Sequence, residues 1–330
     1  MSGPHPATAK VRRAVRAALA DLSLPGTVVL VACSGGGDSM ALAEAVAHEQ
    51  RHAAWRAGAV VVDHGLQAGS GEVAARTVDR LTDLGLAPVE VVRVEVAPDG
   101  AGLEAAARAA RHAALEEAAT RLGAAAVLLG HTLDDQAEQV LLGLVRGSGA
   151  RSLAGMPFAR GLLRRPLLGV TRAECRESCT AEGVGWWDDP MNEDTRHARV
   201  RARRAVADLE ADLGPGVVAA LGRTADQLRE DADHLDALAD AAARDLGPGP
   251  WAAEDLAALP RAVRTRTWRR LLVAAGAPAG QVSTRHTDAC DALVTHWHGQ
   301  GPAHVPGRLR VVRREGNVVV QTAPDDEDGA

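Results

Sequence analysis

The sequence predicts an α/β protein in which a doubly wound parallel sheet is followed by a smaller, mainly helical domain that ends in a β-hairpin. Three observations predict this fold class. Short apolar segments rich in valine alternate with helical patterns in the first half of the chain. A glycine-rich turn follows the first of these segments, and Leu-Gly-Pro-Gly-Pro at 246–250 has the composition of a linker. The 330 residues are enough for two domains.

Four strand–helix pairs make up the predicted sheet. Strands of a parallel sheet are buried on both faces, so their residues need not alternate with polar ones. We expect strands at 27–33, 58–63, 89–96 and 125–130, followed in turn by helices at 38–54, 71–84, 103–122 and 134–145. An amphipathic helix near the N-terminus precedes them.

The second half of the chain predicts mostly helices. They are expected near 171–183, from about Asp194, at 217–245, near 252–275 and near 282–297. Two alternating runs around Glu315-Gly316-Asn317 predict the closing hairpin. We therefore divide the chain into a sheet domain (1–213), a helical linker region (214–250), a small C-terminal domain (251–324) and a disordered tail (325–330).

Composition excludes several classes of protein. No apolar run approaches the length of a membrane span, and the N-terminus lacks the features of a secretory signal. Four cysteines do not form a disulfide framework in a chain of this length, and Cys175 and Cys179 fit buried thiols better than metal ligands, as expected in a reducing cytoplasm. The net charge is −6, and Lys10 is the only lysine, so nearly all positive charge comes from arginine. Local clusters of arginine therefore indicate a basic surface better than the total number of arginines does.

A phosphate-binding loop is predicted between the first strand and its helix. The residues are Ser34, Gly35, Gly36, Gly37, Asp38 and Ser39. The glycines let backbone N–H groups converge on an anion, and the helix N-terminus adds positive potential. Walker A is excluded because no lysine follows the glycines, and the dinucleotide fingerprint fails at Met40. The alternative is a plain glycine-rich turn in which Asp38 and Ser39 begin the helix.

A second motif follows the fourth strand. His131 leaves the strand, and Asp134, Asp135 and Glu138 follow at spacings that place them together at a helix start. Such carboxylates hold Mg²⁺ or recognise an ammonium group. The alternative is structural, because Thr132 and Asp135 also fit a capping box.

Arginines form the remaining motifs. Arg108 and Arg111 lie at helical spacing after Glu104. Either Glu104 and Arg108 form an exposed i,i+4 ion pair, or an arginine of this helix faces a phosphate. Arg199, Arg201 and Arg203 belong to a dense cluster that is either a solvated basic face or a contact for a nucleic-acid backbone.

Together these motifs resemble the tRNA(Ile)-lysidine synthetase family of the PP-loop ATP pyrophosphatase superfamily, whose fold is like that of the adenine-nucleotide alpha-hydrolases. The resemblance covers about residues 25 to 210. It rests on the segments S-G-G-x-D-S, VDHGL (62–66), EAAARAAR, HTLDDQAE, LLGLVRGSG, RPLL and DPMNED, the last of which contains Asn192. The family usually has Asn where this chain has Val200, and longer members carry a further C-terminal domain that we do not expect here.

The resemblance implies a ligase that modifies the wobble cytidine of a CAU-anticodon isoleucine tRNA. ATP adenylates the C2 oxygen, and the amine of free L-lysine then displaces AMP to form lysidine. The loop would hold the pyrophosphate with Mg²⁺ on Asp38, and His131 and Arg111, or Arg108, would face the α-phosphate. Asp135, with Asp134 or Glu138, would receive the lysine amine, and Asn192, Arg199, Arg201 and Arg203 are candidates for substrate contact. Residues 251–324 would bind tRNA.

Two other functions stay open at this point. A PP-loop tRNA thiolase would activate the base in the same way, but such enzymes use reactive cysteines or an iron–sulfur cluster, and this chain has no CxxC. A nucleotide-binding regulatory module would share the sheet and lack the chemistry. The family is often dimeric, but the sequence does not decide whether this chain forms a homodimer.

Overall fold

The computed structural model describes residues 3–63, 65, 69–94, 103–147 and 149–324, and the predicted tail at 325–330 lies outside them. The chain forms two compact units, which divide between Arg229 and Glu230. Helix α9 (Val217–Leu246) contains this division. Our domain boundaries at 213 and 250 stay predictions.

A six-stranded sheet organises the first unit, in the order β3-β2-β1-β4-β6-β5. Its first four strands confirm the four predicted ones. They are β1 (Val28–Ala32), β2 (Arg56–Asp63), β3 (Val89–Arg93) and β4 (Ala124–Leu129), and all pairings among them are parallel. The hairpin of β5 (Ala159–Arg160) and β6 (Leu163–Arg164) was not predicted, because two-residue strands show no periodicity.

The chain reverses its winding direction between β1 and β4. From β1 the chain adds strands outward through β2 and β3, and then returns to place β4 on the other side of β1. Ala32 and Leu129, the last residues of β1 and β4, lie side by side in register. In such sheets the crevice at the carboxyl ends of these two strands is where ligands bind. Ser34 and His131 each follow their strand by two residues and therefore lie at this point.

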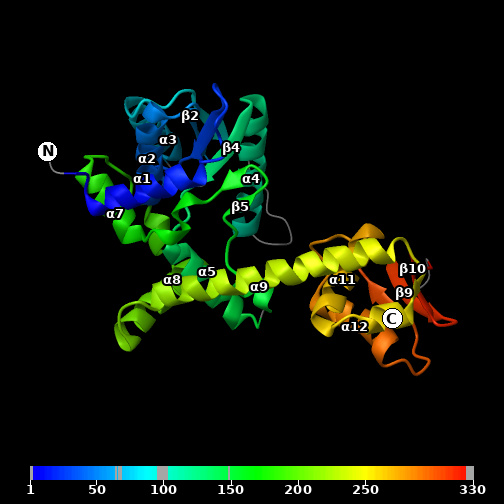
Figure 1. Ribbon diagram of the computed structural model, residues 1–330. Coiled ribbons are helices and arrows are strands. Elements are labelled where there is room, and N and C mark those ends of the chain that lie inside the picture. Colours follow the sequence, from blue (N-terminus) through cyan, green and yellow to red (C-terminus); the bar gives the residue numbers. More distant parts are fainter. Residues whose placement is uncertain (1–2, 64, 66–68, 95–102, 148, 325–330) are drawn as a thin grey trace. The chain divides into compact units, whose positions relative to one another are not determined.

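Helices cover both faces of the sheet (Figure 1). One face packs against α1 (Pro6–Ala18), α2 (Gly37–Glu49), α3 (Ser70–Asp83) and α7 (Arg172–Ala181), and the other face packs against α4 (Leu103–Arg121). Successive residues of β1 alternate between the two cores, with Val29 and Val31 on one side and Leu30 on the other. This burial fixes the register of the strand that carries the glycine-rich loop.

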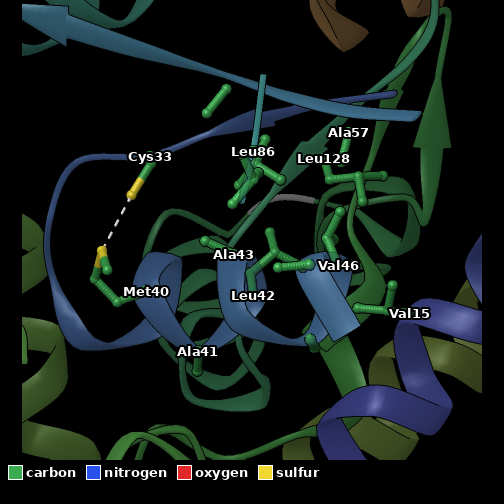
Figure 2. Packing of buried hydrophobic residues seen from close by; sticks show 14 of the residues in the cluster. Val15, Cys33, Met40, Ala41, Leu42, Ala43, Val46, Ala57, Leu86 and Leu128 are labelled. Atoms are coloured by element: carbon green, nitrogen blue, oxygen red, sulfur yellow. Dashed lines mark hydrogen bonds between the residues drawn. The ribbon is translucent and has the colours of Figure 1, made fainter. Parts of the chain in front are cut away.

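The core beneath the loop is formed largely by α2. Figure 2 shows Leu42 and Val46 of this helix packed near Ala57 and Leu128 of the sheet. The thiol of Cys33 donates to Met40 Sδ at 3.6 Å, which links the two ends of the loop. The loop is thus held by a packed core, which limits its freedom to move.

The rest of the first unit is helical. It contains η1 (Gln50–His52), α5 (Leu133–Val145), α6 (Ala150–Leu153), η2 (Pro166–Gly169), η3 (Pro190–Glu193), α8 (Ala198–Leu213) and the start of α9. The arginine-rich helix begins at Ala198, four residues later than predicted. The side chain of Asp194 accepts from the N–H of Arg196 at 2.9 Å and so stabilises a turn at the expected start.

The second unit packs helices against a small antiparallel sheet. Its elements are β7 (Trp251–Ala252), α10 (Ala253–Ala258), α11 (Arg261–Ala274), α12 (Thr284–Thr295), β8 (Ala303–Val305), β9 (Leu309–Arg314) and β10 (Asn317–Thr322). The predicted hairpin is confirmed, and positive φ angles of 50° at Glu315 and 79° at Gly316 match its turn. The short strands β7 and β8, which complete a four-stranded sheet, were not predicted.

Candidate active site

The glycine-rich loop forms a tight turn that only glycine fits. Gly35 has φ +82°, and a Cβ there would lie 2.5 Å from Thr77 Oγ1. Helix α2 begins at Gly37, and its N-cap residue, Gly36, supplies no side-chain cap. The first N–H groups of the helix are therefore directed at the loop, which is the arrangement that binds phosphate.

The two serines of the loop differ in their environment. Ser39 is buried, and its hydroxyl donates to the carbonyl of Gly36 at 2.9 Å and accepts from the N–H of Ser34 at 3.2 Å. Ser34 is exposed, and its hydroxyl lies 3.3 Å from that of Ser39. Ser39 therefore shapes the loop, whereas Ser34 is the better placed to meet a ligand.

Two segments that are distant in the sequence contact the loop. Gly130, directly after β4, approaches so closely that a Cβ there would lie 3.1 Å from the backbone N of Ser39. On another side, the N–H of Trp187 donates to the carbonyl of Gly35 at 2.9 Å. The loop geometry is thus set by contacts with distant parts of the chain.

Asp38 carries a carboxylate that is incompletely satisfied. Its Oδ1 is enclosed and has no hydrogen-bond partner, while Oδ2 lies 3.5 Å from the Nε of Arg172. Burial raises the pKa of Asp38 to about 6, and the charges of Asp135 and Asp134 add to this effect. An enclosed, unpartnered carboxylate oxygen beside a phosphate loop fits Mg²⁺ that is shared with phosphates.

Among the described residues, no three His, Cys, Asp or Glu side chains form a ready metal site. A Mg²⁺ ion held by Asp38 would therefore take its other ligands from phosphate oxygens and water, as is usual for this ion.

Arg172 joins the loop to the second motif, and sequence reasoning missed it. Its Nη2 lies 3.2 Å from both Asp135 Oδ1 and Glu138 Oε1, and its backbone N–H donates to Asp134 Oδ2 at 2.8 Å. Although burial alone would lower the pKa of Arg172, these carboxylates and Asp38 raise it above its usual range. The only local signal is the capping box of Thr171 and Glu174, which predicts where α7 begins but not what it meets.

Asp135 confirms the structural alternative, and its expected role toward Mg²⁺ or an ammonium group stays a prediction. Its Oδ2 accepts from the N–H of Thr132 at 2.8 Å, which completes the capping box at the start of α5. Its Oδ1 pairs with Arg172. Burial alone would raise the pKa of Asp135, but Arg172 and the Thr132 N–H lower it, so the group is charged at neutral pH. Asp135 is thus a helix cap and a member of the charged cluster.

His131 and Arg111 lie among several arginines, and Asp135 is the carboxylate that acts on the pKa of both. The Nδ1 of His131 and the Nε of Arg111 are both enclosed and have no partner. Burial lowers the pKa of His131 to about 3 and that of Arg111 to about 10, and nearby arginines such as Arg108 contribute to both shifts. The histidine is therefore neutral at pH 7, and the region is electrostatically suited to a phosphate.

The arginines of α8 have different roles. Arg203 Nε donates to Glu138 Oε1 at 2.9 Å, and Arg199 is half-buried and close enough to affect Arg111. Arg201 is exposed, and its Nη1 donates to the carbonyls of Thr195 and Arg196, both at 2.8 Å. The structure thus brings Arg199 and Arg203 to the site and leaves Arg201 outside it.

Three further positions of the sequence motifs are Asn192, Glu104 and Val200. The side chains of Asn192 and Glu104 lie outside the described part of the structure, although Asn192 belongs to η3. Val200, where the resembling family usually has Asn, is buried in α8. It contributes apolar packing in place of any hydrogen bond.

A cavity of about 510 Å³ opens beside the charged cluster, between α5, α8 and the start of α9. Carboxylates of Asp134, Glu138 and Glu210 line it together with Arg172 and Arg203. Its apolar wall includes Val206, Pro215 and Val218. The cavity therefore offers both charges and an apolar surface to a small zwitterion.

The sheet, the loop and the carboxylate of Asp38 define a PP-loop protein, and residues 7–210 match the PP-loop domain family. Residues 252–319 match the family described as the TilS substrate binding domain. The chain belongs to the tRNA(Ile)-lysidine synthase family. The tRNA(Ile)-lysidine synthase of Thermobifida fusca is 53% identical over 323 residues, which are 97% of this chain and 99% of that protein. That of Streptomyces coelicolor is 49% identical over 351 residues, with the same coverage.

A solved structure shares the fold. The U34-tRNA thiolase NcsA from Methanococcus maripaludis, which contains a 4Fe-4S cluster, matches with a TM-score of 0.57 over 68% of this chain and 80% of its own. At 18% identity this likeness concerns the fold alone.

The cysteines of this chain are unlike those needed for sulfur transfer. All four are free and buried. Burial raises the pKa of Cys33 and Cys175 above the usual range, and that of Cys179 and Cys290 to about 12. Reactive thiols need a lowered pKa.

In the described residues, no helix is both long and apolar enough to cross a membrane.

Proposed function

We propose that this chain joins free L-lysine to C2 of the wobble cytidine in a CAU-anticodon isoleucine tRNA and consumes ATP. One observation supports this most directly. Arg172 connects the phosphate loop, through Asp38, to carboxylates that line a cavity with an apolar wall. An ATP site is thus adjacent to a site suited to a small amine, as a two-step ligation requires. Membership of the tRNA(Ile)-lysidine synthase family agrees with it.

In the first step, the C2 oxygen of cytidine attacks the α-phosphorus of ATP. A new P–O bond forms, and the bond to the β-phosphate breaks, so that pyrophosphate leaves with the electron pair. The N–H groups of the loop would hold the leaving pyrophosphate, with the exposed hydroxyl of Ser34 beside them. His131 and Arg111, with their unpartnered nitrogens, would stabilise charge on the α-phosphate. When bound at Asp38, Mg²⁺ supplies positive charge against the phosphates.

In the second step, the ε-amine of lysine attacks C2, the C2–O bond breaks and AMP leaves. The methylenes of lysine would lie on Val206 and Val218, and its charged ends would meet Arg203 and the carboxylates. A lysine amine has a pKa of about 10.4, so it must lose a proton before it attacks. Asp134 lines the cavity and is our candidate acceptor of this proton.

Since tRNA and ATP are cytoplasmic, we place the reaction in the cytoplasm.

Pyrophosphate release tests the two-step order. The protein is incubated with Mg²⁺, ATP and an unmodified CAU-anticodon isoleucine tRNA transcript, with and without lysine. We expect pyrophosphate only when the transcript is present, and adenylated RNA should accumulate when lysine is omitted. Release without RNA, or RNA that gains sulfur from a sulfur donor in place of lysine, would contradict the proposal.

A further inference from the structure

Two further side chains near Arg111, Arg165 and His112, hold enclosed nitrogens without a partner, and the reaction above does not use them. Arg165 directly follows β6 and is 3% exposed. Its Nη1 donates to the carbonyl of Pro157 at 2.8 Å, but its Nε is enclosed with no partner. On α4, the Nε2 of His112 is also enclosed and unpartnered. Each residue thus holds a nitrogen that water does not reach and that the protein does not satisfy.

The charges around Arg165 have the same sign. In the described part of the chain, the residues that act on it are Arg108, Arg160 and Arg229, which add to burial in lowering the pKa of Arg165 to about 10. Burial and the same kind of neighbours lower the pKa of His112 to about 4, so it is neutral at pH 7. Arg172, by contrast, is surrounded by carboxylates. A buried cation is unfavourable when its described neighbours carry no counter-charge, so the group around Arg165 fits a site that receives an anion.

The sheet order shows which anion is near. The phosphate loop follows β1, His131 follows β4, and Arg165 follows β6, which pairs with β4 through Leu128 and Arg164. Adjacent strands lie about 4.8 Å apart, so Arg165 is two strands, or roughly 10 Å, from the strand that carries the loop. Helix α4, which carries His112, packs on the sheet face that includes Leu129 of β4 and Leu163 of β6, and Arg165 is close enough to His112 to help lower its pKa. The site therefore lies past the proposed α-phosphate position, on the side away from the pyrophosphate.

We propose that Arg165 and His112 bind a backbone phosphate of the substrate RNA beside the wobble cytidine. This inference rests on the proposed function. A phosphodiester held there would fix the nucleotide on the β6 side, while its base reaches back to His131 and Arg111. Arg165 supplies a charge-assisted hydrogen bond, and neutral His112 supplies an N–H donor. Both are positioning residues for the base that reacts.

The test replaces Arg165 with Met and with Lys, and His112 with Ala. The control is Arg121→Met, at the far end of α4, where an exposed arginine pairs with Glu90 at 2.8 Å. We expect Arg165→Met to raise the KM for tRNA at least tenfold and to leave ATP affinity, measured without RNA, unchanged. The slope of log affinity for the RNA against log salt should fall by about one. Arg165→Lys should restore part of the affinity, and Arg121→Met should behave as the unmodified protein.

Thermal unfolding separates this role from a structural one. Because no described residue supplies a counter-charge to Arg165, Arg165→Met should keep or raise the unfolding temperature. A lower unfolding temperature with an unchanged salt slope would make Arg165 a structural cation and overturn the inference. Weaker ATP binding with unchanged RNA binding would assign the site to a phosphate of ATP and also overturn it. If the unmodified protein incorporates lysine but Arg165→Met alters neither KM nor slope, this inference fails while the proposed function stands.

Discussion

Asp38, a proposed Mg²⁺ ligand, shows at the scale of one residue how burial of a carboxylate opposes stability. Its carboxylate is partly enclosed with an unpartnered oxygen, and burial raises its pKa to about 6. Between pH 4 and 6 the folded protein therefore binds a proton at Asp38 that the unfolded chain does not. By linkage, the contribution of Asp38 to the free energy of unfolding decreases as pH rises through this range and stays low above it.

Asp38→Asn should therefore stabilise the ligand-free protein while it abolishes ligation. We expect the free energy of unfolding at pH 7 to rise by up to about 3 kcal/mol. The gain should largely disappear at pH 4, where Asp38 is already protonated. Urea unfolding at both pH values measures it, with Asp79→Asn, an exposed position on α3, as the control. Lower stability of Asp38→Asn at pH 7 would show that the charged carboxylate is favourable in the fold.

Residues within one local motif could be predicted, and those brought together by tertiary structure could not. The loop from Ser34 to Ser39 was found because strand, turn and helix are contiguous in the sequence. The capping box at Asp135 was confirmed, but its pairing with Arg172 was not foreseen, and its expected contact with Mg²⁺ or an ammonium group stays a prediction. Arg172 was missed because its partners lie on other elements, at least 34 positions away.

At the scale of elements, Arg172 connects α7 to α5 and to the start of α2. It is surrounded by three carboxylates, of which Glu138 is buried. Removing one partner of a buried ion pair leaves the other charges uncompensated. The mutual attraction in this cluster therefore holds the three helix ends around the proposed ATP and lysine sites.

Arg172→Met should destabilise the protein by about 3–5 kcal/mol, the loss usual for an unpaired buried charge. Arg176→Met, one turn later on α7, removes an exposed pair with Asp188 and should change stability by about 0–1 kcal/mol. Denaturant unfolding compares the two variants. Equal losses in the free energy of unfolding would mean that the cluster around Arg172 stabilises the fold no more than a surface ion pair does.

Long, periodic elements were predicted well, and short ones were not. The four main strands and the hairpin at Glu315–Gly316 were predicted from continuous apolar or alternating runs. Strands β5 to β8 have two or three residues each, and their pairing depends on neighbours that the sequence does not indicate. This limit affects the proposed RNA contact, because Arg165 directly follows β6.

At the scale of the whole molecule, a net charge of −6 must be reconciled with an RNA substrate. The positive charge is concentrated locally, and strand β9 alone carries Arg310, Arg313 and Arg314. Arg313 is held in the fold, since its Nη1 donates to the carbonyl of Leu293 at 2.9 Å and its guanidinium lies over Trp297. Arg314 is exposed and better suited to a phosphate.

Arg314→Gln should weaken tRNA binding and reduce the slope of log affinity against log salt by about one, because one phosphate contact is lost. The rate at saturating tRNA should be unchanged, as Arg314 lies outside the unit that holds the proposed catalytic residues. Filter binding at several salt concentrations measures the slope. Arg76→Gln, which removes an exposed arginine beside Glu72 on α3, is the control. An unchanged slope would exclude Arg314 from the RNA contact.

The incorporation of radiolabelled lysine into RNA tests the central claim most directly. The protein, Mg²⁺-ATP and labelled lysine are incubated with an unmodified CAU-anticodon isoleucine transcript or, separately, with the methionine tRNA that has the same anticodon. We expect acid-precipitable label in the isoleucine transcript alone. Label in neither RNA, from a preparation that binds ATP, or equal label in both, would contradict it.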